Sequence, residues 1–114
     1  TGHPVTVAEL DGEIVGWGSL GPFRPRDGLR HTVENSLYVR HDRHRRGIGA
    51  ALLADLIARA RAAGHHAIIA GISAEQTASI ALHRRFGFTE AALLREVGRK
   101  FDRWLDLAYW QLLL

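Results

Sequence analysis

The sequence contains no cysteine, which excludes a disulfide framework, a thiolate metal site and a cysteine nucleophile. It also lacks any apolar run near the length of about 18 residues that a membrane-spanning helix requires. The segment Thr1–Glu9 shows none of the basic, apolar and small-residue parts of a secretory signal. From these absences we expect a cytoplasmic protein without a membrane partner.

What is present describes an ordinary globular domain. The chain has 114 residues, of which 46% are hydrophobic and 24% charged, and this size suits one core. Its net charge of +3 favours an anionic partner, which could be a phosphorylated cofactor, an acidic substrate or nucleic acid. We therefore expect a single domain over residues 1–114.

The pattern of β-branched and apolar residues predicts six strands, and these are Val5–Leu10, Glu13–Leu20, His31–Val39, Ala67–Ile72, Thr89–Val97 and Trp104–Leu113. Asp11-Gly12 tolerates the positive φ angles of a tight hairpin turn between the first two strands. Proline and glycine predict a loop over Gly21–Gly28, and Gly98–Arg103 is expected to be a polar turn.

Two helices are expected between these strands. Apolar residues recur at helical spacing over Gly47–Ala63, and Gly64 predicts the end of this helix. Ser73 and Gln76 have the spacing of a capping box, which predicts a second helix ending near Phe86-Gly87. The resulting order, β-β-β-α-β-α-β-β, indicates one mixed α/β fold.

The segment His41–Ala50 combines basic residues with Gly47 and Gly49 at the start of the first helix. Glycines there remove side chains that would block a ligand, so that main-chain N–H groups and the positive helix end meet phosphate oxygens. The segment is neither a Walker loop nor a dinucleotide fingerprint, because no Gly-Lys-Ser/Thr follows and Leu52 stands three residues after Gly49. Another phosphate-bearing ligand is needed.

The run His44-Arg45-Arg46-Gly47-Ile48-Gly49 resembles the pyrophosphate loop of the GNAT acetyltransferase superfamily, with His44 where Gln or Arg is usual. Three further stretches, Thr32–Val39, Ile80–Phe88 and Val97–Asp106 followed by Trp110-Gln111, resemble the phosphinothricin and methionine sulfone/sulfoximine acetyltransferase branch. The resemblance implies a GNAT-like, mostly antiparallel sheet flanked by helices. It also implies an N-acetyltransferase that uses acetyl-CoA as cosubstrate on a small amino-acid-like amine.

Complete members of this superfamily begin with a further strand and two helices, whereas this chain begins at what would be their second strand. We therefore expect an N-terminally shortened domain. An uncovered sheet edge and exposed apolar surface would favour a homodimer.

The resemblance assigns two catalytic residues. Glu34 matches the carboxylate proposed as general base, and the alternative is an exposed strand carboxylate. His83 lies where the superfamily often has the tyrosine that protonates the leaving thiolate, and the alternative is a helix histidine bonded near the sheet. The two roles could also be exchanged.

The resemblance further assigns residues to the two substrates. Those expected at the cofactor are Leu37, Tyr38, Val39, His44, Arg45, Arg46, Gly47, Ile48, Gly49, Ala50, Gln76 and Ser79. Those expected at the acceptor are Phe23, Arg24, Arg26 and Thr32. Gln76 would contact the pantetheine arm or, as the favoured alternative, serve only in the capping box. The two arginines would bind a carboxylate or phosphinate, or belong to a solvated loop.

The remaining histidine, aromatic and basic residues do not indicate a further catalytic site. His41 and His44, like His65 and His66, lack a third ligand for zinc, and no metal is expected. Trp104, Tyr109 and Trp110 are interpreted as core or interface aromatics. A non-catalytic coenzyme A-binding module remains an alternative to the enzyme. Nucleic-acid binding by the basic cluster 40–46 is another, disfavoured because no aromatic residues are interleaved with it.

Overall fold

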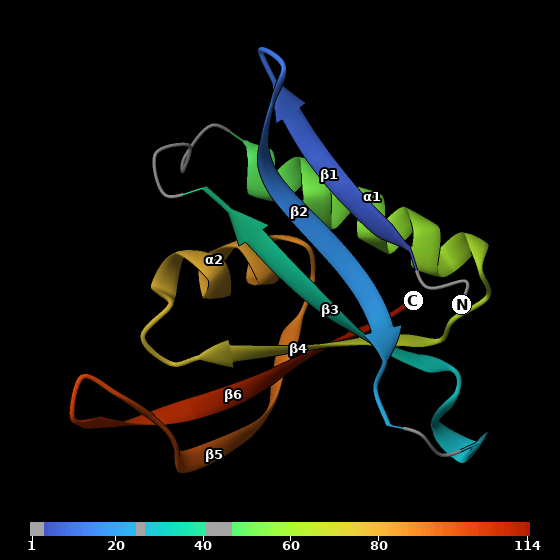
Figure 1. The fold of residues 1–114 in the computed structure, drawn as a ribbon. Coiled ribbons are helices and arrows are strands. Elements are labelled where there is room, and N and C mark those ends of the chain that lie inside the picture. Colours follow the sequence, from blue (N-terminus) through green and yellow to red (C-terminus); the bar gives the residue numbers. More distant parts are fainter. Residues whose placement is uncertain (1–3, 25–26, 41–46) are drawn as a thin grey trace.

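In the computed structural model, residues 4–24, 27–40 and 47–114 are described. The elements are β1 (Val5–Leu10), β2 (Glu13–Pro22), a 3-10 turn (Asp27–Leu29), β3 (Thr32–Val39), α1 (Ile48–Ala62), β4 (Ala67–Ser73), α2 (Thr77–Arg85), β5 (Thr89–Lys100) and β6 (Arg103–Leu113). The strands form one six-stranded sheet in the order β1-β2-β3-β4-β6-β5 (Figure 1). Only β3 and β4 are parallel, and the other neighbours are antiparallel. The predicted order and fold class are confirmed.

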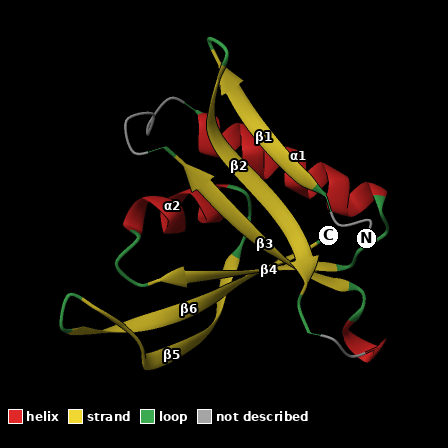
Figure 2. Ribbon diagram, in the orientation of Figure 1, coloured by secondary structure: helices red, strands yellow, loops and turns green. Residues whose placement is uncertain are grey.

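Both helices pack on the same face of the sheet (Figure 2). Leu53 and Leu56 of α1 form the core together with sheet residues such as Val33 and Ile68, and α2 packs against this core through Leu82. Gly16 and Gly18 let α1 approach closely, since a Cβ on Gly18 would lie 2.9 Å from Leu56 Cδ1. The opposite face of the sheet carries exposed side chains, including Val7, Trp17 and Tyr38.

Local backbone chemistry explains two of the predicted boundaries. Asp11 and Gly12 have φ angles of 52° and 82°, as a two-residue turn between twisted strands requires. Gly64 has φ of 81° directly after the C-cap of α1. Both predictions are confirmed.

The predicted capping box is wrong. Ser73 is the last residue of β4, and α2 begins only at Thr77, with Gln76 as an N-cap that makes no side-chain capping bond. The main-chain N–H of Gln76 donates to the carbonyl of Ser73 at 2.9 Å, so a turn precedes the helix. The capping interpretation of Gln76 therefore fails, and its side chain remains available for another role.

The predicted turn over Gly98–Arg103 is wrong in extent. Strand pairing continues through Lys100 and resumes at Arg103, and the turn consists of Phe101 and Asp102, with φ angles of 50° and 58°. The additional residues are accommodated by a bulge around Glu96, whose N–H donates to the Asp106 side chain at 3.0 Å. A strand bulge, which the sequence does not display, makes the hairpin longer than expected.

Within the described ranges, neither helix is long and apolar enough to cross a membrane.

Candidate functional site

The central feature of the sheet is a wedge between its two parallel strands. β3 and β4 pair at only three positions, from Thr32 with Ala67 to Glu34 with Ile69. Beyond them β3 continues beside β2 and β4 beside β6, so that the strands diverge toward their carboxyl ends (Figure 1). Strands that separate in this way expose main-chain groups to which an extended ligand can hydrogen-bond.

The start of α1 lies at the mouth of this wedge. A Cβ on Gly49 would be 3.1 Å from Leu82 Cδ2 of α2 and 3.8 Å from Val39 Cγ2 at the end of β3. A residue larger than glycine would therefore be crowded at position 49, because α1, α2 and the end of β3 converge there. Gly47 has a φ of 74° and open space around the position of a Cβ, and no side chain caps the helix. The uncapped first turn presents main-chain N–H groups suited to an anion.

The three basic residues expected beside this turn, His44, Arg45 and Arg46, lie outside the described residues. Ile48 packs toward β2, since its Cγ2 is 3.3 Å from the position of a Gly16 Cβ, and Ala50 is partly buried. The structure thus places Val39 beside Gly49 at the start of α1, and their contact with a cofactor stays a prediction.

Glu34 lies on the sheet face opposite the helices, because its neighbours Val33 and Asn35 are buried beneath them. Its Oε2 is 3.7 Å from the position that a Cβ on Gly71 of β4 would take. Cε1 of Tyr109 on β6 is 3.4 Å from the same position. A carboxylate and a phenol ring therefore flank a gap that Gly71 leaves between them.

Phe23 extends this group of residues from the end of β2. Its ring meets that of Tyr109 edge to face, with centroids 6.5 Å apart. Arg24 folds back on Phe23, with its guanidinium 4.2 Å from the ring centroid and Nη1 donating to the Phe23 carbonyl. Thr32 precedes Glu34 by two residues on the same face, whereas Arg26 lies outside the described residues. Three of the four residues expected at the acceptor thus lie toward the Glu34 side.

His83 is 2% exposed, and protein groups occupy both its ring nitrogens. Nδ1 lies 2.8 Å from the carbonyl oxygen of Ser79, and Nε2 lies 3.3 Å from Nδ2 of Asn35. The ring also packs edge to face on Phe88 at 4.9 Å. Proton donation to a ligand would require Nε2 to leave Asn35, so the acid role of His83 stays a prediction.

Burial lowers the pKa of His83 below its ordinary value, and the hydrogen bond to Ser79 opposes this only in part. Below about pH 6.5, the unfolded chain then binds a proton that the folded chain resists, so acidification destabilises the fold. We expect wild type to lose more unfolding free energy than His83→Gln between pH 7.5 and pH 5, measured by urea denaturation. Parallel losses in both proteins would contradict this prediction.

Four other expected cofactor residues have distinct environments. Leu37 packs into the core, so a contact with a ligand would use its main chain. Tyr38 is half exposed on the opposite face and stacks on Trp17 at 6.4 Å. Ser79 offers its carbonyl to His83. Gln76 reaches into a hollow at the carboxyl end of β4.

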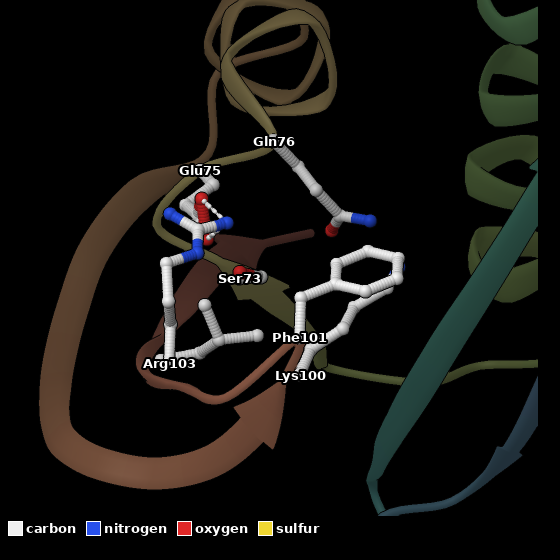
Figure 3. A pocket seen from close by; sticks show the side chains of 7 residues that line it. Ser73, Glu75, Gln76, Lys100, Phe101 and Arg103 are labelled. Carbon is white, nitrogen blue, oxygen red and sulfur yellow. Dashed lines mark hydrogen bonds and ion pairs between the residues drawn. The ribbon is translucent and has the colours of Figure 1, made fainter.

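That hollow has a volume of about 220 Å³ and lies between β4, the start of α2 and the β5–β6 turn (Figure 3). It is lined by Ser73, Glu75, Gln76, Lys100, Phe101, Arg103 and Leu105. Arg103 is held by Glu75 at 2.7 Å on one wall. Ser73 follows Gly71 by two residues, which places the hollow farther along the face that carries Glu34.

Three residues of the site escaped the sequence analysis. Asn35 is a polar residue between the inward-facing positions Val33 and Leu37, and a polar side chain at a buried position points to a specific hydrogen-bonding role. Gly71 interrupts an apolar strand, and such a glycine often marks a close approach. Tyr109 had been interpreted as a core or interface aromatic, and only the fold places it opposite Glu34.

No group of three or more histidine, aspartate or glutamate side chains able to hold a metal ion occurs among the residues with described positions.

The sequence profile of the Acetyltransferase (GNAT) family matches residues 1–88. The chain is 49% identical over 112 residues to the L-methionine sulfoximine/L-methionine sulfone acetyltransferase of Pseudomonas aeruginosa, covering 97% of this chain and 65% of that protein. This chain therefore spans slightly less than two thirds of that relative's length.

Two solved structures are similar in fold as well as in sequence. The crystal structure of ribosomal-protein-alanine N-acetyltransferase from Brucella melitensis has a TM-score of 0.95 and 53% identity, covering 99% of this chain and 70% of that one. The phosphinothricin acetyltransferase of Sinorhizobium meliloti, solved in complex with AcCoA, has a TM-score of 0.95 and 39% identity, covering 99% and 62%.

Proposed function

The chain belongs to the acetyltransferase (GNAT) family, and on this premise we propose that it binds acetyl-CoA in the wedge and transfers the acetyl group to an amine. The observation that carries the proposal is the divergence of β3 from β4 beside the uncapped start of α1. The diphosphate would meet the first turn of α1, and the pantetheine arm would follow β3 past Leu37 and Tyr38.

The acceptor amine would approach from the face that carries Glu34. The amine nitrogen attacks the thioester carbon, a C–N bond forms, the C–S bond breaks, and the leaving thiolate takes up a proton from water that balances the proton lost by the amine. Glu34 takes the proton of the amine directly or through water. With no cysteine in the chain, direct attack in a ternary complex is favoured over a thiol-linked acyl-enzyme.

We propose a small amino-acid-like acceptor of the methionine sulfone or phosphinothricin type, which the names of the relatives support. Arg24 and Thr32 would bind its polar end, and the hollow lined by Lys100 offers a second cationic contact. The name of the Brucella protein refers to an alanine of a ribosomal protein, so we propose a peptide beginning with alanine as the competing acceptor.

The experiment is a calorimetric titration with acetyl-CoA, followed by a thiol-release assay with methionine sulfone, phosphinothricin and an alanine-led peptide. Binding with turnover on the first two supports the proposal. Binding without turnover would favour the non-catalytic module. Absence of binding, with tight salt-sensitive DNA binding instead, would favour the nucleic-acid alternative.

Gly47→Ala tests whether the main-chain N–H groups at the start of α1 bind the diphosphate of acetyl-CoA. An L-residue at a φ of 74° costs about 1–2 kcal/mol, and distortion of the first turn should raise the Kd of acetyl-CoA about tenfold. Gly64→Ala is the matched control, because it places the same strain, at a φ of 81°, at the other end of α1. It should lower stability without changing the Kd. Equal Kd values for wild type, Gly47→Ala and Gly64→Ala would show that the start of α1 does not bind the diphosphate.

The proposal includes a homodimer formed along β5. This strand is an edge of the sheet and carries exposed Leu93, Leu94 and Val97. Gel filtration at the monomer mass would count against the dimer. A cytoplasmic location and a reaction without metal stay predictions.

A further inference from the structure

One atom of the buried pair formed by Asn35 and His83 has no partner. The side-chain oxygen Oδ1 of Asn35 makes no hydrogen bond within the described part of the chain. Asn35 is only 6% exposed, so bulk water does not compensate for the missing bond. Buried polar atoms without partners are rare because they are costly, and each one requires an explanation.

The chemistry of His83 fixes which end of the Asn35 amide lacks a partner. The carbonyl of Ser79 only accepts hydrogen bonds, so Nδ1 of His83 must carry the hydrogen. In the neutral ring Nε2 is then an acceptor, and Asn35 must turn its NH₂ group toward it. The carbonyl oxygen of Asn35 consequently points away from the ring.

Asn35 stands where the wedge begins. Glu34 is the last residue of β3 that pairs with β4, and Asn35 is the next one. Its unpaired oxygen is therefore a buried acceptor on the helix-covered side of the sheet, next to the apex of the wedge proposed to hold the arm of the acyl donor. That arm contains amide N–H groups, which are donors of matching chemistry.

We propose that Oδ1 of Asn35 accepts a hydrogen bond from an amide N–H of the pantetheine arm, and that His83 is a positioning residue that holds the amide in this orientation. The inference rests on the proposed function. It gives His83 a role through Asn35 that requires the neutral ring, in place of proton donation to the thiolate. The lowered pKa of His83, caused by burial, agrees with a neutral ring.

The binding test compares acetyl-CoA with its phosphoadenosine diphosphate half, which lacks the arm. Asn35→Leu should weaken the binding of acetyl-CoA about 3- to 10-fold, which corresponds to one neutral hydrogen bond, and leave the affinity for the half-molecule unchanged. Ser36→Ala, an exposed neighbour on the other face, is the control and should change neither affinity.

His83 is tested by its dependence on Asn35. His83→Leu should cause a similar loss, expressed in KM more than in kcat, and adding Asn35→Leu should weaken binding no further. His83→Gln restores an acceptor near the position of Nε2 and should recover most of the affinity. A large fall in kcat with unchanged KM in His83→Gln would instead make His83 the acid and overturn the inference.

A measurement on wild type avoids any folding defect of the variants. The chain has one asparagine and two glutamines, so the side-chain amide of Asn35 is readily assigned by NMR. Its signals should shift on addition of acetyl-CoA and stay unchanged with the half-molecule. Unchanged signals when acetyl-CoA binds would overturn the inference alone, whereas failure of wild type to bind acetyl-CoA would overturn the proposed function.

Discussion

Glu34→Gln is expected to lower kcat by about 10²- to 10⁴-fold while leaving the Kd of acetyl-CoA unchanged. The amide keeps the size of the carboxylate but cannot take a proton from the attacking amine. Glu34 faces the gap at Gly71, on the opposite side of the sheet from the core, so that its loss should not disturb packing. The measurement is steady-state thiol release at saturating acetyl-CoA.

The pH dependence of this defect provides a second readout. As pH rises toward the pKa of the acceptor amine, more of the amine is already neutral, and the difference between wild type and Glu34→Gln should shrink. Glu90→Gln, an exposed carboxylate on β5, is the control and should behave as wild type. An unaltered kcat in Glu34→Gln would remove Glu34 as the base.

Gly71→Val is expected to lower kcat/KM for amino-acid acceptors about 100-fold. A Cβ alone would fit, since its nearest neighbours, Tyr109 Cε1 and Glu34 Oε2, would be 3.4 and 3.7 Å away. The two methyl groups of valine need further space, which the carboxylate, the phenol ring and Leu107, with Cδ1 at 3.8 Å, now occupy. Displacing a catalytic group by about 1 Å costs on the order of 10²-fold in rate.

The same substitution should leave the fold and the donor site intact. Valine suits a strand, and acetyl-CoA would bind along β3, so Tm and the Kd of acetyl-CoA should change little. Gly71→Ala should give a smaller loss of rate, because a Cβ alone fits the gap. If Gly71→Val acetylates its acceptors at the wild-type rate, the gap between Glu34 and Tyr109 is not the acceptor site.

The glycine-lined, uncapped start of α1 was predictable because its signal is local. Gly47 requires a positive φ, and a glycine pair opening a helix is recognisable in any window of the chain. The role expected for Glu34 came from the resemblance of Thr32–Val39 to known acetyltransferases. No local rule distinguishes that carboxylate from any other on a strand.

The predictions of the capping box and of the long polar turn were wrong because long-range strand pairing overrode the local signal. Ser73 and Gln76 have the spacing of a cap, but pairing with β6 extends β4 through Ser73 and delays the helix. Gly98 is typical of a turn, yet it lies in a strand beyond the bulge at Glu96. In both cases pairing with β6 outweighed local propensity.

The sequence by itself determined the order of the elements, the hairpin at Asp11-Gly12 and the glycine-lined helix start, because periodicity and backbone preference act over a few neighbouring residues. Only the tertiary structure decided that β3 and β4 separate after Glu34, and that Glu34 and Tyr109 flank Gly71. It also decided that Asn35 hydrogen-bonds to His83. These are contacts between residues tens of positions apart. Their geometry depends on strand order and packing, which no single stretch of the chain encodes.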